Sequence, residues 1–139
     1  MTQTGPMSTS VDSPNVYQPG VCNIGPAEIR QRRMSGYLGL AVAVVFLVVA
    51  YALAWPAWAR LFVALPVALA ATGFLQAAFH FCVRFGTQGL FNFGELGTQE
   101  AVHEADYRRK DQRKALLIVG LTAVIAAVVA IAAFLVPLP

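Results

Sequence analysis

The polar side chains that could do chemistry in this chain lie in one apolar segment. Four of them recur at every fourth position: Thr72, Gln76, His80 and Arg84. On a helix this spacing forms one stripe, next to the small residues Gly73 and Ala77. The imidazole could ligate a haem or chlorin, or the stripe could line a path for a small anion or a proton. The alternative is that these side chains only make hydrogen bonds between helices.

This segment is one of three apolar runs that determine the class of the protein. Residues 36–55, 61–83 and 115–136 contain no formal charge. At ~1.5 Å per residue, a helix of about twenty residues crosses a hydrocarbon layer of ~30 Å. The composition agrees, with 58% hydrophobic and 12% charged residues in 139. The sequence therefore predicts an all-α integral membrane protein with a single three-helix domain over residues 26–139.

The basic residues are distributed unevenly about these three spans. Only Arg60 lies in the turn between the first two spans, and the other nine precede the first span or lie in the loop 84–114. The positive-inside bias predicts an inner-membrane protein with a cytoplasmic N-terminus and loop, and a C-terminus outside. We expect five side chains to anchor the protein at the two membrane surfaces: Trp55, Trp58, Arg30, Arg32 and Arg33.

The segments outside the spans predict one arm and two helix starts. Residues 1–25 lack periodic apolar residues, which predicts a flexible arm. Pro26 suits the first position of a helix, and Glu28 places a carboxylate near its positive end. Thr98, with Glu100 in the following turn, predicts a second helix start. That helix would be an amphipathic cytoplasmic extension of the third span.

Two features of the chain predict packing contacts. In the third span, two lines of small side chains allow close helix approach, within the bundle or between subunits: Thr122, Ala126 and Ala130, beside Ala123 and Ala127. In the loop, an apolar group could lie in the membrane interface or contact a neighbouring subunit: Phe85, Leu90, Phe91 and Phe93.

The two cysteines, Cys22 and Cys82, both map to the cytoplasmic side in this topology. A structural disulfide is not expected in that compartment, and the spacing indicates no metal site. Cys82, beside the membrane surface, is either a reactive thiol or a small packing residue.

A short motif precedes the first span. Asn23, Gly25, Glu28, Arg32 and Gly36 follow the pattern Asn-x-Gly-x-x-acid-x-x-x-Arg-x-x-x-Gly. This pattern resembles the opening of the small bacterial inner-membrane domains that are sometimes fused to rhodanese domains.

The second span adds to this resemblance, which covers residues 22–85. Thr72-Gly73 followed by Cys82 is similar to the second helix of that family. The chain departs from the family by a third span, by lacking a rhodanese domain, and by Cys82-Val-Arg-Phe85 in place of a Cys-Pro-Leu-Tyr type ending. The resemblance implies a helical hairpin, dimerisation and a link to sulfur chemistry.

The sequence contains no catalytic constellation and no nucleotide motif. It therefore predicts a non-enzymatic accessory or scaffold subunit of a larger membrane complex or homo-oligomer. Its expected partners are membrane lipids and membrane subunits, without nucleic acid. The alternative is a membrane binding or transport module that uses the stripe for a tetrapyrrole or a small anion. No cofactor is expected outside that alternative, in which His80 would hold a haem or chlorin.

Overall fold

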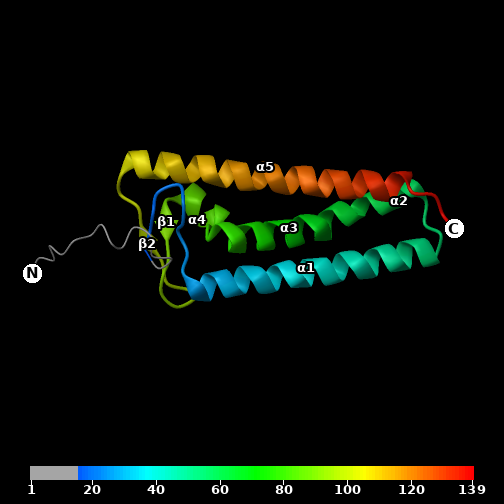
Figure 1. Ribbon diagram of the computed structural model, residues 1–139, viewed down its shortest axis with the longest axis horizontal. Coiled ribbons are helices and arrows are strands. Elements are labelled where there is room, and N and C mark those ends of the chain that lie inside the picture. Colours follow the sequence, from blue (N-terminus) through cyan, green and yellow to red (C-terminus); the bar gives the residue numbers. More distant parts are fainter. Residues whose placement is uncertain (1–15) are drawn as a thin grey trace, which may run out of the picture.

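Three long helices form an elongated bundle in the computed structural model, which describes residues 16–139 (Figure 1). They are α1 (Pro26–Ala52), α3 (Ala64–Phe79) and α5 (Ala105–Leu135). The central helix α3 packs against both of the others. Together with the turns before α3, the three helical segments are long and apolar enough to cross a membrane. The prediction of a mostly helical protein with three helices long and apolar enough to cross a membrane is therefore confirmed.

Helix α1 begins where the sequence predicts. Pro26 occupies its first position, Gly25 precedes it with extended backbone, and Glu28 lies in its first turn. The missing N–H of a proline costs nothing there, because the first N–H groups of a helix have no partner within the helix.

The second span consists of three consecutive helical pieces. They are α2 (Ala57–Arg60), the 3-10 turn η2 (Leu61–Val63) and α3. Pro66 lies in the first turn of α3 and has no N–H to donate to the preceding turn, which accounts for the tighter 3-10 geometry just before it. Helix α3 ends at Phe79, although the apolar run continues to Val83, because His80 takes the left-handed conformation with φ 55°.

Helices α1 and α3 cross at glycines. A Cβ atom on Gly73 would lie 2.5 Å from the backbone nitrogen of Gly36 and 2.6 Å from the carbonyl oxygen of Arg32. A Cβ atom on Gly39 would lie 2.5 Å from the nitrogen of Ala70. The two backbones are therefore in direct contact, which is the close approach that small residues permit between helices in lipid.

One end of the bundle carries a cap, which we define as residues 16–25 and 80–104 (Figure 1). It contains α4 (Val83–Gln88) and the short antiparallel pair β1 (Leu90–Phe91) and β2 (Glu100–Ala101). We name residues 16–25 the strap. The opposite end, with the α1–α2 turn and the C-terminus, is the hairpin end.

Two predictions about the cap are wrong. The strap is not a flexible arm, because residues 22–25 are buried and paired with other segments of the cap; residues 1–15 of the predicted arm lie outside the described residues. Thr98 does not start a helix. Its hydroxyl donates to Oδ1 of Asn92 at 2.8 Å within the loop, and α5 begins at Ala105 after Glu104.

Candidate functional site

A buried polar network joins the strap to the end of α3. The side-chain amide of Asn23 donates to the carbonyl oxygen of Cys82 at 3.2 Å and accepts from the backbone N–H of Cys82 at 2.7 Å. The backbone N–H of Asn23 also donates to the carbonyl oxygen of His80 at 3.1 Å. Asn23 is fully buried. One side chain thus pairs both backbone groups of Cys82 near the end of α3.

An ion pair between the buried Glu28 and the partly buried Arg32 extends this network onto α1. Glu28 Oε1 lies 3.3 Å from Nη2 of Arg32, and Glu28 Oε2 accepts from Nδ2 of Asn92 at 3.1 Å. Nη2 of Arg32 also donates to Sγ of Cys82 at 2.9 Å. Cys82 is only 1% exposed. Its sulfur therefore accepts a hydrogen bond inside the cap and is not accessible unless the cap opens.

Asn92 ties the loop that follows α4 to the strap. Its backbone N–H donates to the carbonyl of Asn23, and its own carbonyl accepts from the N–H of Gly25, both at 2.9 Å. Its side-chain oxygen accepts from the N–H of Gly94 and from Thr98 Oγ1, both at 2.8 Å. A single amide thereby organises the 92–98 loop around the start of α1.

The residues that carry the family resemblance meet in this network. Asn23 and Arg32 bond to Cys82, Glu28 pairs with Arg32, and Gly36 makes the crossing with α3. Gly25 is also a packing requirement, since a Cβ atom there would lie 2.9 Å from Cα of Phe93. The motif therefore builds the junction between the strap, the loop and the first helix pair.

A second attachment holds the strap to α5. Asp111 is 0% exposed, and its carboxylate accepts from the hydroxyl of Tyr17 at 2.6 Å and from the N–H of Gly20 at 2.7 Å. Burial raises the pKa of the Asp111 carboxyl above its usual range, while these hydrogen bonds oppose the rise. Burial and the contact with Asp111 raise the pKa of the Tyr17 phenol. Burial also raises the pKa of the Cys22 thiol, whose Sγ donates to Val16 O at 3.1 Å.

Sequence reasoning missed Asp111, although a signal was present. The buried face of α5 runs through Ala115, Ile118 and Thr122. Extending this helical spacing by one more turn toward the N-terminus reaches Asp111. Asp111 thus lies on the buried face of α5, within a segment that is otherwise rich in solvated charges.

The predicted stripe does not form, because α3 ends before it is complete. Thr72 donates its hydroxyl to that of Thr122 on α5 at 3.3 Å, as a helix-contact residue. Gln76 Oε1 accepts from the N–H of Val83 at 2.7 Å, at the start of α4. Arg84 is exposed on α4, with its guanidinium 5.2 Å from the centre of the Phe85 ring. His80, in the left-handed turn between the helices, does not continue the face of α3.

Of the two predicted lines of small residues on α5, only one faces the interior of the bundle. Thr122, Ala126 and Ala130 are buried, whereas Ala123 and Ala127 are exposed on the outer face of α5. Gly73 and Ala77 are buried on α3, and both cysteines are buried and free. The first line is therefore a contact within the bundle.

At the hairpin end, Arg60 caps the C-terminus of α5. It is only 4% exposed, and its Nη1 donates to the carbonyl of Val136 at 3.1 Å, while Nη2 donates to that of Phe134 at 3.5 Å. Its guanidinium lies 4.7 Å from the centre of the Tyr51 ring, and Tyr51 itself donates to the carbonyl of Ala133 at 2.9 Å. The last carbonyls of a helix attract a cation. Arg60 is thus a buried cap within the tight turn.

The expected membrane anchors divide between exposed and packed side chains. Trp58, Arg30 and Arg33 are exposed. Trp55 packs edge-on against Phe46 with ring centres 5.5 Å apart. Arg32 is not a free anchor, because Glu28 and Cys82 engage it inside the cap.

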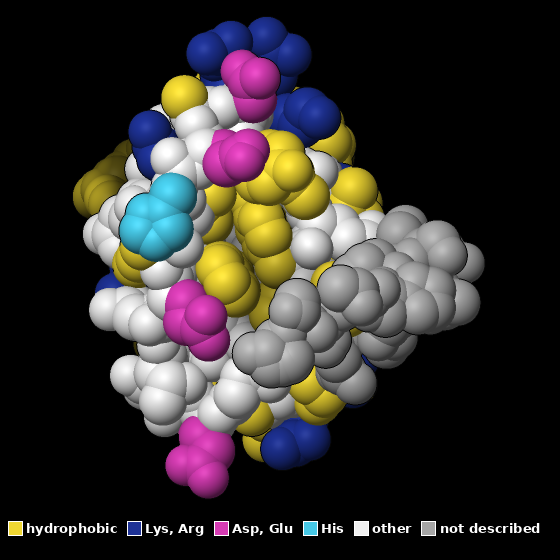
Figure 2. Space-filling model, turned by 90° about the vertical axis from the view of Figure 1, so that its left-hand side faces the viewer, with side chains coloured by type: hydrophobic (Ala, Val, Ile, Leu, Met, Phe, Trp, Pro, Cys, Tyr) yellow, Lys and Arg dark blue, Asp and Glu magenta, His cyan; other side chains and the backbone are white. Residues whose placement is uncertain are grey.

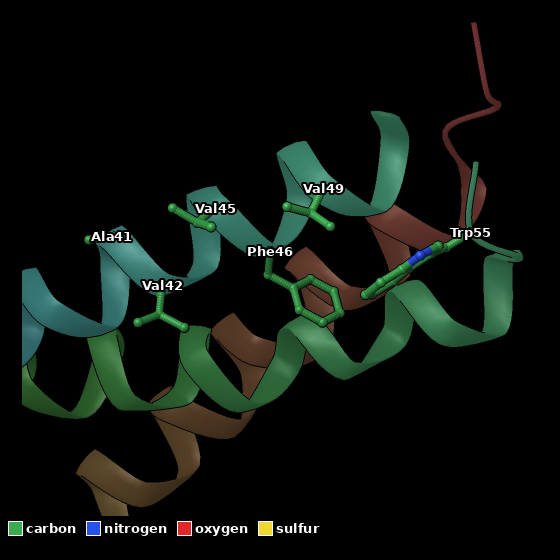
Figure 3. Close-up of a pocket in the computed structure, with 6 residues that line it drawn as sticks. All are labelled: Ala41, Val42, Val45, Phe46, Val49 and Trp55. Carbon is green, nitrogen blue, oxygen red and sulfur yellow. The ribbon is translucent and has the colours of Figure 1, made fainter. Parts of the chain in front are cut away.

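An apolar hollow of about 430 Å³ lies on the surface of α1 toward the hairpin end (Figure 3). Figure 3 shows Phe46 and Trp55 side by side at one end of it, with its other lining residues along α1: Ala41, Val42, Val45 and Val49. None of these side chains is titratable. The hollow therefore supplies an apolar surface and no reactive group.

The apolar group of the loop divides between core and surface. Phe85 is 2% exposed and Leu90 packs against the same core cluster. Phe91 stacks on Tyr17 with ring centres 4.8 Å apart, and further ring contacts at 6.2 and 6.4 Å extend the group to Phe93 and Tyr107. We call these four rings the aromatic cluster: Tyr17, Phe91, Phe93 and Tyr107. Figure 2 shows hydrophobic side chains at the centre of this end of the molecule, with charged side chains around them.

Comparisons with known proteins add no family assignment to this geometry. No protein-family model, curated protein or solved structure matches the chain. Within residues 16–139, no group of three or more His, Cys, Asp or Glu side chains is placed to hold a metal ion. The buried network and the aromatic cluster are therefore the two features of the cap from which function can be argued.

Proposed function

We propose that this protein is a non-enzymatic scaffold subunit of a membrane assembly, in which the three helices hold the cap at the membrane surface and the aromatic cluster binds a neighbouring subunit. The observation that carries the proposal is the position of these rings. Tyr17, Phe91 and Phe93 are half-buried and Tyr107 is 38% exposed, and all four lie outside the apolar spans. Grouped aromatic side chains outside the hydrocarbon layer are typical of the centre of protein interfaces.

The polar network supports a structural role for the rest of the cap. The side chains of Asn23, Glu28 and Gln76 are buried and engaged with other groups of the protein. A catalytic group needs access to a substrate. A rigid, internally bonded cap is instead suited to presenting a fixed surface to another subunit.

The proposal includes an orientation in a bacterial inner membrane. The fold gathers the basic residues of α1, of α4 and of the start of α5 at the cap end, which favours a cytoplasmic cap and an external C-terminus. Cysteine labelling in intact cells tests this orientation. Leu138→Cys should react with an impermeant reagent, and Thr98→Cys should react only after lysis. The reverse pattern would contradict the orientation.

Native mass spectrometry tests the scaffold role. The protein, expressed at its native level and extracted in a mild detergent, should appear as a defined complex with another subunit or with itself. Phe93→Ser with Tyr107→Ser should release it as a monomer, because these substitutions remove two rings of the cluster. Gln88→Ser, at an exposed position of α4 outside the cluster, should leave the complex intact. A strictly monomeric wild-type protein would refute the proposal.

A further inference from the structure

A pocket of about 370 Å³ lies between the strap and α5, at the edge of the cap. Three cationic side chains on one helix face the strap across it, and an apolar side chain lies one turn beyond them. The lining residues are Pro19, Gly20, Lys110, Arg113, Lys114 and Leu117.

The position of this pocket along α5 matches the headgroup layer of a membrane. Lys114 is the last charged residue of the helix, and the uncharged run starts at Ala115. Leu117 lies within that run and is 49% exposed. A cation at the boundary and an apolar side chain just inside it are the two contacts that a phospholipid headgroup and its acyl chain require.

The charge in the pocket favours an anion. Lys110 and Arg113 are exposed, while Lys114 is half-buried with Nζ 4.4 Å from the centre of the Phe79 ring. Asp111 is the carboxylate next to these cations, but it is fully buried and accepts hydrogen bonds from the strap. Three cations therefore line the opening, with one carboxylate behind it.

Gly20 allows the strap to form the opposite wall. Its φ of +72° is a left-handed conformation that glycine adopts without strain. A Cβ atom there would lie 3.1 Å from Cβ of Lys110, so the strap approaches α5 closely at this point. The hydrogen bond from Gly20 to Asp111 fixes this wall relative to the cations.

We propose that this pocket binds the phosphate of an anionic phospholipid in the adjacent leaflet, with Lys110 and Arg113 on the phosphate and Leu117 against an acyl chain. Lys114, held over Phe79, supplies a third positive charge at the base of the headgroup. Because the strap forms one wall, a bound lipid also holds the strap on α5. The site thus couples the lipid composition of the membrane to the closure of the cap.

Lipid retention by the full-length protein in native mass spectrometry tests the site. The wild type in mild detergent, titrated with phosphatidylglycerol, should retain one lipid that phosphatidylcholine does not replace. Lys110→Gln with Arg113→Gln should weaken this binding about twenty-five-fold, since each cation near a lipid surface contributes about a factor of five. Both side chains are exposed, so the fold should persist. Arg30→Gln with Arg33→Gln removes the same charge from exposed positions of α1 and should leave the affinity unchanged.

Two further measurements separate a lipid site from other sources of the same chemistry. Inorganic phosphate at the same concentration should not displace phosphatidylglycerol, because it lacks the acyl chain that contacts Leu117. Hydrogen exchange of the Val21 and Cys22 amides should slow when the lipid is added to the wild type. Equal loss of affinity in the Arg30 and Arg33 variant, or displacement by inorganic phosphate, would overturn the assignment to a phospholipid.

Discussion

Each end of the bundle packs an arginine against other groups of the protein, but the two ends pair it differently. At the cap end, Arg32 contacts a carboxylate and a sulfur, and amide side chains complete the network around it. At the hairpin end, Arg60 donates hydrogen bonds to carbonyl oxygens at the end of α5 and lies over the face of Tyr51. The cap network joins several separate segments of the chain, whereas the Arg60 cap closes the end of one helix. Removal of a side chain should therefore cost more at the cap.

Asn23→Ala should give the largest loss of stability. It leaves the buried backbone N–H of Cys82 without a partner, at ~1–3 kcal/mol, and removes one of the two hydrogen bonds to the Cys82 carbonyl, which still accepts from the N–H of Gly86 at 2.9 Å. We therefore expect a loss of about 3 kcal/mol. The unfolding free energy in bicelles, measured by steric trapping, provides the check. Gln88→Ala, which removes an exposed amide from α4, should change it by less than about 0.5 kcal/mol. Equal values for the two variants would mean that Asn23 is not the centre of the network.

Gly73→Ala should cost about 2 kcal/mol, because the added methyl group would overlap the backbone of α1 and force the helices apart. The same assay applies. Gly120→Ala is the matched control, since a Cβ atom at that position of α5 meets nothing within 4 Å. The control should be neutral or stabilising, as alanine is the better helix former. A neutral Gly73→Ala would show that the crossing tolerates a wider separation.

Arg60→Met should cost only about 1 kcal/mol, although it removes a buried charge. The lost hydrogen bonds are partly offset, because a buried cation is costly to desolvate and Tyr51 still bonds the last carbonyls. Within residues 16–139, Nε of Arg60 has no hydrogen-bond partner, and the same is true of Nε of Arg32 in the cap. Combined with Asn23→Ala, the two losses should add, because the sites share no contact. A loss larger than that of Asn23→Ala would reverse the comparison of the two ends.

The smallest effect should come from the pH dependence of the strap. The folded state raises the pKa of Tyr17, so its neutral phenol stabilises the attachment below pH 10.0, and this contribution is lost as the pH rises through the higher folded value. Up to about pH 11, Tyr17 should therefore stay neutral and contribute nothing to the tyrosinate absorbance. The absorbance should then rise by the same amount in the wild type and in Tyr17→Phe. Asp111→Asn, which removes the carboxylate beside the phenol, should make Tyr17 ionise at lower pH. A larger rise in tyrosinate absorbance near pH 10 for the wild type than for Tyr17→Phe would contradict the buried contact between Tyr17 and Asp111.

Hydropathy predicted the three long apolar helices and their order but not where each helix ends. Residues 77–83 contain no glycine, asparagine or proline, so they carry no local signal for the left-handed turn at His80 that stops α3 at Phe79. This turn separates Gln76 from Arg84 and breaks the predicted stripe. Local spacing assumes one continuous helix, and a non-glycine residue with positive φ is set by its tertiary contacts.

The candidate site was predictable only as a set of residue types. The motif from Asn23 to Gly36 was visible, but its partners Cys82 and Asn92 lie far along the chain. Arg60 was expected in a tight turn, and nothing local indicates that it meets the end of α5. Contacts between such distant segments depend on the packing of the whole bundle, which periodicity within one helix does not report.

The bond between Tyr17 and Asp111 has a consequence for the order of biosynthesis. It joins residues 94 positions apart, so the strap can be fastened only after the first part of α5 has left the ribosome. Until then, Phe81, which packs against Ala115 and Ile118 of α5 and is fully buried in the folded protein, lacks that cover. In a nascent chain that stalls before α5, the strap is therefore unattached and accessible to cellular proteases. Once α5 has been made, the strap binds to it and is protected. The cap can thus close only after the synthesis of the third helix has begun.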